Sequence, residues 1–100
     1  MVKHIVLWNF NQSLTAEERE AAAKRMKEEL EAIKPLVPGT AELQVVKNEM
    51  DSSNCDIALI STFESKEALE QYQGHPKHLE AKDFIAGVVE RRVCLDYEVS

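Results

Sequence analysis

The stretch QYQGHPKH, from Gln71 to His78, contains two of the three histidines and one of the two tyrosines of this chain. An imidazole titrates near neutral pH, so His78 could act as a general base that removes a proton next to a carbonyl group. Tyr72 could donate a hydrogen bond to the developing enolate oxygen, or orient the imidazole. The structural alternative is that His78 bonds a backbone carbonyl and that Tyr72 is a core residue with a satisfied hydroxyl.

Three further residues are candidates for contact with a ligand: His4, Trp8 and His75. His75 precedes Pro76, which biases its backbone to an extended conformation, so its ring could instead close the helix. His4 and Trp8 share one face of a predicted strand. A lone histidine on such a face is usually a satisfied core residue, and the sole tryptophan of a small core usually serves packing. A ligand-binding role and a structural role therefore stand side by side for all three.

The residue pattern predicts no metal ion and no cofactor. Cys55 and Cys94 stand alone, without the paired spacing of a structural zinc site, and we interpret them as reduced thiols. A turn with two histidines and no nearby carboxylate pattern is weak evidence for a metal. The three glycines form neither a phosphate-binding loop nor a GxSxG motif, so cofactor-dependent chemistry is not indicated.

Charge and hydropathy argue against two classes of partner. Lys and Arg number 12 against 18 Asp and Glu, which gives a formal net charge of −6. Phosphate binding needs clustered basic residues, and the chain has only two basic doublets, Lys24-Arg25 and Arg91-Arg92, so we expect no nucleic-acid partner. No apolar run approaches the length of a bilayer span, and the chain opens directly on a strand-like pattern without a signal peptide. We therefore expect no membrane association and a cytoplasmic location.

Strands and helices must position the candidate residues. A capping box of Thr15 and Glu18 predicts the start of a long first helix. Gly74 and Pro76 separate two later helical segments, because glycine ends helices and proline opens them. Runs of β-branched and aromatic residues predict the strands. The predicted strands cover residues 2–10, 40–48, 56–63 and 88–99, and the two later helical segments cover residues 66–72 and 77–86.

The order of these elements is β-α-β-β-α-β, with an extra helical turn before the last strand. This order predicts an α+β, ferredoxin-like fold, in which a four-stranded antiparallel sheet carries its helices on one face. We expect a single domain over residues 1–100, since a chain of this length supports one core of modest size.

The sheet is predicted to be apolar on its other face too. In the first strand Ile5 and Leu7 alternate with Val6, so apolar side chains leave both faces. The strand at residues 56–63 has the same character. In the last strand one side is predicted to carry Val89, Val93, Leu95 and Tyr97. Because the helices can cover only one face, we expect the same face of a second copy, related by a two-fold axis, to cover the other.

Four segments resemble the stress-responsive A/B-barrel domain family: VKHIVLWNF, TFESKEALEQY, HPKH and VCLDYEV. The resemblance runs over essentially the whole chain. It implies a ferredoxin-like fold whose two sheets pack into a dimeric α/β barrel between subunits. It implies no single activity, because most bacterial members have no assigned reaction and some plant members are stress-induced proteins.

One plant member of that family cyclises a linear polyketide, and its motif residues are matched in part. That enzyme uses a histidine and a tyrosine at the positions of His78 and Tyr72, and a third histidine at the position of His4. Another of its histidines is replaced by Ile57, and the aromatic residues that enlarge its pocket along the first helix are absent. The resemblance therefore implies a cleft between helices and sheet, but a smaller one.

The leading hypothesis is a homodimer that binds a small apolar or carbonyl ligand in this cleft. If it is an enzyme, we expect cofactor-free acid–base chemistry of the cyclase or lyase type, with His78 as base and Tyr72 as hydrogen-bond donor. One alternative is a non-catalytic stress-related or structural dimer. A second alternative is a cofactor-free enzyme resembling the monooxygenases of similar fold.

Overall fold

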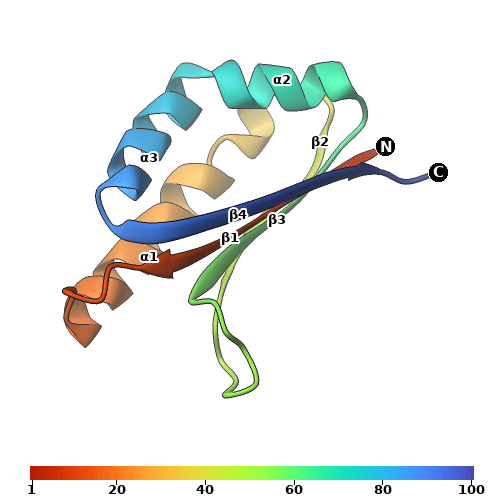
Figure 1. Cartoon of the computed structure of the whole chain (residues 1–100). Helices are drawn as coiled ribbons and strands as arrows, with labels where there is room; N and C mark the ends of the chain where they lie inside the picture. Colours follow the sequence, from red (N-terminus) through yellow and green to blue (C-terminus); the bar gives the residue numbers. More distant parts are fainter.

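All the predicted strands and helices are present in the computed structural model, which describes residues 1–100 (Figure 1). The elements are β1 (Val2–Phe10), α1 (Ala16–Glu31), the short 3-10 helix η1 (Lys34–Leu36), β2 (Thr40–Lys47), β3 (Ile57–Phe63), α2 (Lys66–Gly74), α3 (Pro76–Ala86) and β4 (Val89–Glu98). Each strand and each of the two later helices lies within two residues of its predicted bounds. No helix combines the length and the hydropathy that a membrane crossing requires.

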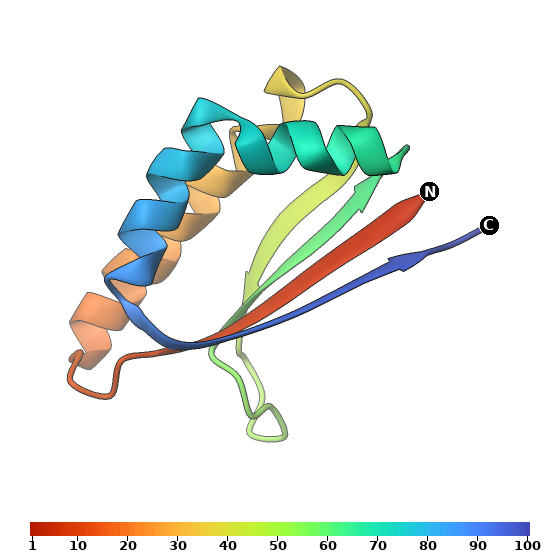
Figure 2. The same ribbon diagram turned by 45° about the horizontal axis from the view of Figure 1, so that its top comes forward.

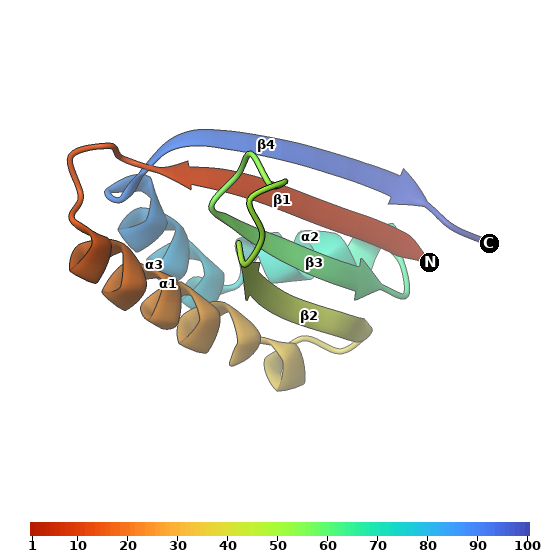
Figure 3. The ribbon, with the colours of Figure 1, turned by 90° about the horizontal axis from the view of Figure 1, so that it is seen from below.

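The four strands form one antiparallel sheet in the order β2-β3-β1-β4. The three α-helices lie on one face of this sheet and leave the other face bare (Figure 2). Seen from below, β4 forms one edge of the sheet and β2 the other, and α1 and α3 run side by side (Figure 3). This arrangement is the ferredoxin-like α+β fold that the element order predicts.

The helix-covered face is where the core forms. Alternate residues of β1 are buried against the helices, in the period of two that a pleated strand imposes: Val2, His4, Val6, Trp8 and Phe10. Helix α1 begins at the predicted capping box, in which the Thr15 Oγ1 accepts from the Glu18 N–H at 3.1 Å and the Glu18 carboxylate accepts from the Thr15 N–H at 2.8 Å. Its apolar stripe then packs on the sheet.

The bare face carries apolar residues in adjacent strands. Ile5 pairs with Ile60 of β3 and with Leu95 of β4, so the three side chains leave the same face as neighbours. Leu95 is 61% exposed. The prediction that Val89 shares this face is wrong. A register shift between Asn9 and Phe10 pairs Val89 with Phe10, which turns its side chain toward the helices, whereas Val93, Leu95 and Tyr97 lie on the bare face.

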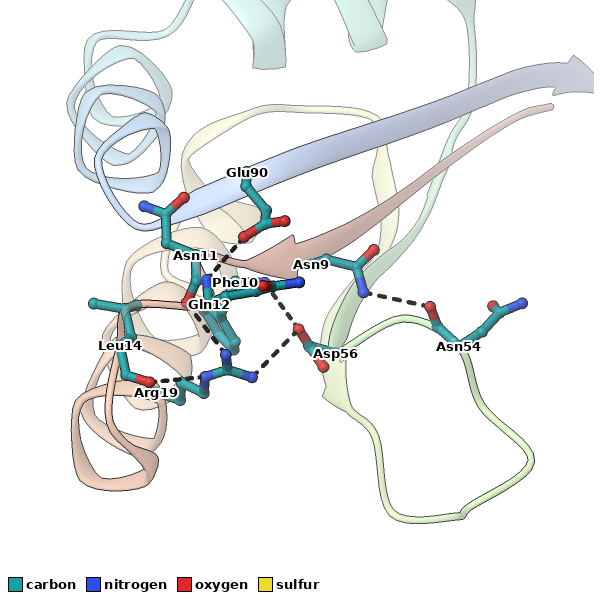
Figure 4. A network of polar contacts seen from close by, with 9 residues as sticks. All are labelled: Asn9, Phe10, Asn11, Gln12, Leu14, Arg19, Asn54, Asp56 and Glu90. Carbon is teal, nitrogen blue, oxygen red and sulfur yellow. Dashed lines mark hydrogen bonds and ion pairs between the residues drawn. The ribbon is translucent and has the colours of Figure 1, made fainter.

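The turn after β1 is fixed by a carboxylate at the start of β3 (Figure 4). The Asp56 Oδ2 accepts from the Phe10 N–H at 2.8 Å and lies 4.0 Å from the Arg19 guanidinium. Arg19 in turn donates to the carbonyls of Leu14 and Asn11, each at 3.2 Å. Asp56 therefore ties together the end of β1, the turn and the first turns of α1.

Asp56→Ala is expected to lower the free energy of unfolding by about 2 kcal/mol, because a half-buried backbone N–H and a guanidinium lose a charged acceptor. Urea denaturation at a fixed protein concentration measures this change. Asp51→Ala is the matched control, because Asp51 is an exposed loop aspartate whose side chain makes no hydrogen bond. Its free energy of unfolding is expected to stay within about 0.5 kcal/mol of that of wild type. Equal effects of the two substitutions would refute the anchoring role of Asp56.

Candidate active site

A cavity of about 440 Å³ lies between the helices and the helix-covered face of the sheet. Most of its lining residues are apolar, and the lining comes from β1, β3, β4 and all three α-helices. The lining residues with titratable side chains are His4, Tyr72, His78, Lys82 and Arg92. Trp8 also lines the cavity. The volume falls within the range of small-molecule sites in proteins.

The junction of α2 and α3 gives the two histidines of the HPKH motif different roles. Pro76 occupies the first position of α3, so His75 is the N-cap residue and has an extended backbone. The His75 Nδ1 accepts from the Lys77 N–H at 3.1 Å. His75 is not among the cavity-lining residues, contrary to the ligand-binding role predicted for it, because its ring folds back to satisfy the helix end.

His78 lines the cavity one turn further along α3. Its Nδ1 lies 2.9 Å from the Gln73 carbonyl oxygen, and since a carbonyl only accepts, Nδ1 carries the proton. In the neutral ring this leaves Nε2 free as a proton acceptor. Burial lowers the pKa of His78 below 6.5, helped by the positive charges of Lys82 and Arg92, while the bond to Gln73 acts in the opposite direction. The backbone bond predicted as the structural alternative is thus present, and it leaves the ring in a form suited to a base.

We expect the His78 imidazole to titrate below 6.5, as followed by NMR of its ring signals, with His78→Gln used to assign them. Because the folded pKa is below the unfolded one, the unfolded chain binds more protons in acid. The stability that the neutral ring contributes is therefore complete above about 6.5 and is lost as the pH falls below it. A titration midpoint at or above 6.5 would contradict this burial effect.

Tyr72 lines the cavity and is completely buried. Its ring centroid lies 4.6 Å from that of His78 and 5.2 Å from that of Phe63. Its hydroxyl has no hydrogen-bond partner, so the structural alternative of a satisfied hydroxyl does not hold. Burial raises the pKa of Tyr72 far above its usual value of 10.0, so the hydroxyl stays protonated and can donate. It is sealed from solvent, and a ligand reaches it only when lining side chains move.

His4 and Trp8 leave β1 on the cavity face, both more than nine-tenths buried. The His4 Nδ1 is hydrogen-bonded to the carboxylate of Asp96, its direct cross-strand partner in β4. This bond orients the ring, whose centroid lies 6.2 Å from that of Tyr72. The indole Nε1 of Trp8 has no partner.

The sequence did not indicate a functional role for three polar residues of the site: Lys82, Arg92 and Asp96. Asp96 belongs to the VCLDYEV segment that carries the family resemblance, and nothing in that segment indicates that it opposes His4. Arg92 appeared as half of a basic doublet, whereas the strand directs Arg91 and Arg92 to opposite faces. Only the register of β4 on β1 reveals these partners.

One group of side chains could hold a metal ion. The Cys94 Sγ lies 3.7 Å from the His4 Nδ1 and 3.6 Å from the Asp96 Oδ1, so a thiol, an imidazole and a carboxylate converge. A metal would require a thiolate. Burial and the neighbouring Asp96 instead raise the pKa of the Cys94 thiol, and the His4 Nδ1 is already bonded to Asp96.

The antiparallel sheet under three helices, with a cavity between the two layers, defines a ferredoxin-like α+β protein. The chain belongs to the stress-responsive A/B barrel domain family, whose sequence model matches residues 2–99. This agrees with the resemblance carried by its opening strand, its HPKH turn and its last strand.

Two relatives and one more distant neighbour illustrate the similarity. A dimeric protein of unknown function from Bacteroides fragilis is 32% identical, with a TM-score of 0.91 over 98% of this chain and 95% of that chain. The stress-response A/B barrel domain-containing protein HS1 of Arabidopsis thaliana is 29% identical over 97% of this chain and 88% of its own length. A hydroxynitrile lyase from Passiflora edulis, 18% identical, shares the fold with a TM-score of 0.78 over 99% of this chain and 93% of that chain.

Proposed function

We propose that this protein binds a small carbonyl compound in the helix–sheet cavity and acts on it by acid–base chemistry without a cofactor. The observation that carries the proposal is the Tyr72 hydroxyl, which is buried without a partner beside the imidazole of His78. An unsatisfied buried hydroxyl costs free energy, so its retention requires an explanation, and a ligand that completes its bonding is one. A carbonyl oxygen is the acceptor that this donor lacks.

The division of labour follows from the protonation states. His78 Nε2 takes a proton from the carbon next to the carbonyl, and the electron pair of the broken C–H bond passes to the oxygen as an enolate. Tyr72 stays protonated and donates to that oxygen, where negative charge develops. His78 then returns its proton to the product. The burial of Tyr72 strengthens the bond that it donates, because little solvent competes with it.

We further propose that the working molecule is a homodimer. The support is the bare sheet face, where Val46, Val93, Leu95 and Tyr97 are exposed around the half-buried Ile5. An apolar face of this kind on one protomer favours association, and a two-fold axis lets one face cover its own copy. The Bacteroides fragilis relative, 32% identical, is described as dimeric.

A non-catalytic dimer is the rival function, and two observations favour it. The Tyr72 hydroxyl is sealed from solvent, and the His78 ring already has a structural bond to the Gln73 carbonyl. Under this alternative the cavity is a packing defect at the helix junction, and the Tyr72 and His78 side chains contribute only to stability.

Deuterium exchange decides between the two functions. A panel of small ketones and aldehydes is incubated with the protein in heavy water, and NMR follows deuterium uptake at the carbon next to the carbonyl. Removal of that proton is the step assigned to His78, so wild type is expected to accelerate uptake and His78→Gln to lose the acceleration. Uptake by wild type that does not exceed that of His78→Gln for any compound would favour the non-catalytic dimer.

A further inference from the structure

The fully charged groups around the cavity have the opposite sign to the protein as a whole. The chain has a formal net charge of −6, yet the lining includes Lys82 and Arg92 and no Asp or Glu. Neither cation takes part in an ion pair, and the nearby Asp96 carboxylate is bonded to His4. Unpaired cations grouped at one cavity of an acidic protein attract an anionic ligand.

A second observation indicates a ligand with acceptor oxygens. The indole Nε1 of Trp8 is a donor only, and it is buried without a partner. Trp8 is the direct cross-strand partner of Arg92, so the two side chains leave the cavity face as neighbours. The Tyr72 hydroxyl is the other buried donor without a partner, and it lines the same cavity. A ligand with acceptor oxygens would satisfy both the two unpaired donors and the two unpaired cations of this cavity.

We propose that the cavity binds a small apolar carboxylic acid, with its carboxylate held by Arg92, Lys82 and the indole N–H of Trp8. Lys82 and Arg92 are exposed and have long flexible side chains, so they can swing aside to admit the ligand and then close over its carboxylate. This inference rests on the proposed function for its second part, in which a carbonyl group of the same molecule contacts Tyr72 and His78. The substrate class is then a small oxo acid whose hydrocarbon part lies against the apolar walls.

Three matched compounds test the anion site by calorimetry at low salt. Phenylpyruvate carries both a carboxylate and a ketone, hydrocinnamate carries only the carboxylate, and phenylacetone carries only the ketone. Both acids are expected to bind at least about tenfold more tightly than phenylacetone, because a charge-assisted pair forms in a partly desolvated site. Binding of the acids weakens as salt is added, and binding of phenylacetone does not.

Substitutions of the two cations test whether the tighter binding of the acids arises at the cavity. Arg92→Gln and Lys82→Gln are each expected to weaken binding of hydrocinnamate about tenfold and to leave phenylacetone unchanged. Arg91→Gln is the matched control, since it removes the same charge from the opposite face of β4, and it is expected to change neither affinity. Hydrocinnamate has no ketone, so its binding is independent of the proposed catalysis.

The outcomes separate the two proposals. Hydrocinnamate binding that depends on Arg92 supports the anion site even if wild type fails to accelerate deuterium exchange. Acceleration of exchange in phenylacetone, with no advantage for either acid, overturns the anion site and leaves the proposed function standing. Equal loss of acid binding in Arg91→Gln and Arg92→Gln also overturns it, because overall charge would then explain the effect. Failure of both acids to bind wild type overturns it outright.

Discussion

Tyr72→Phe is expected to raise the free energy of unfolding by about 1 kcal/mol, because it removes a buried hydroxyl that has no hydrogen-bond partner. The phenyl ring keeps the contacts with Phe63 and His78, so packing changes little. The same substitution is expected to reduce the rate of protein-catalysed deuterium exchange about 100-fold, because the enolate oxygen loses its donor. Gain of stability together with loss of activity is the signature of a hydroxyl retained for function.

Tyr97→Phe is the matched control for this substitution. Tyr97 is the other tyrosine of the chain, and it lies on the bare face of the sheet, away from the cavity. The substitution Tyr97→Phe is expected to leave the deuterium exchange rate unchanged. Urea denaturation and the exchange assay are run on both variants at equal protein concentration. A Tyr72→Phe protein that is less stable than wild type would indicate that the hydroxyl does find a partner, and full exchange activity in that variant would remove Tyr72 from the mechanism.

Leu95→Asp is expected to convert the proposed dimer to a monomer, seen as about half the mass in light scattering at micromolar concentration. Leu95 is 61% exposed in the single chain, so the aspartate stays solvated there and costs the protomer little. In the proposed dimer the carboxylate would be buried among apolar side chains, at a cost of several kcal/mol. The two-fold axis applies that cost twice, once for each copy.

Leu79→Asp is the control for the dimer, because Leu79 is 48% exposed on α3 and lies on the helical side of the molecule. Its mass is expected to equal that of wild type. If wild type itself has a monomeric mass, the proposed homodimer is wrong and the bare face requires another partner. If Leu95→Asp remains dimeric, the two copies associate through a different surface.

The sequence predicted the elements well because their signals are local. The capping box at Thr15 and Glu18, the break at Gly74 and Pro76, and the β-branched runs each act within a few residues. The candidate residues Tyr72 and His78 lie together on the cavity. Their proximity across a helix break came from the family resemblance, since helical spacing alone does not place them side by side.

Contacts between segments far apart in the sequence could not be predicted from local residue patterns. His4 and Asp96 are 92 residues apart, and their bond depends on the register of β4 on β1. A one-residue change in that register would turn the side chains of β4 to the other face. The bulge that moves Val89 to the helical side has no local signal in the sequence, which is why its face was predicted wrongly.

By itself, the sequence determined the order of the elements and the two apolar faces of the sheet, because periodicity and capping are properties of neighbouring residues. The tertiary structure alone decided which polar groups remain unsatisfied. Whether the hydroxyl of Tyr72 and the indole N–H of Trp8 find acceptors, and whether Arg92 finds a carboxylate, depends on what lies across the cavity from them. Any such acceptor would belong to another strand or helix, so only the packed fold decides whether one lies within bonding distance.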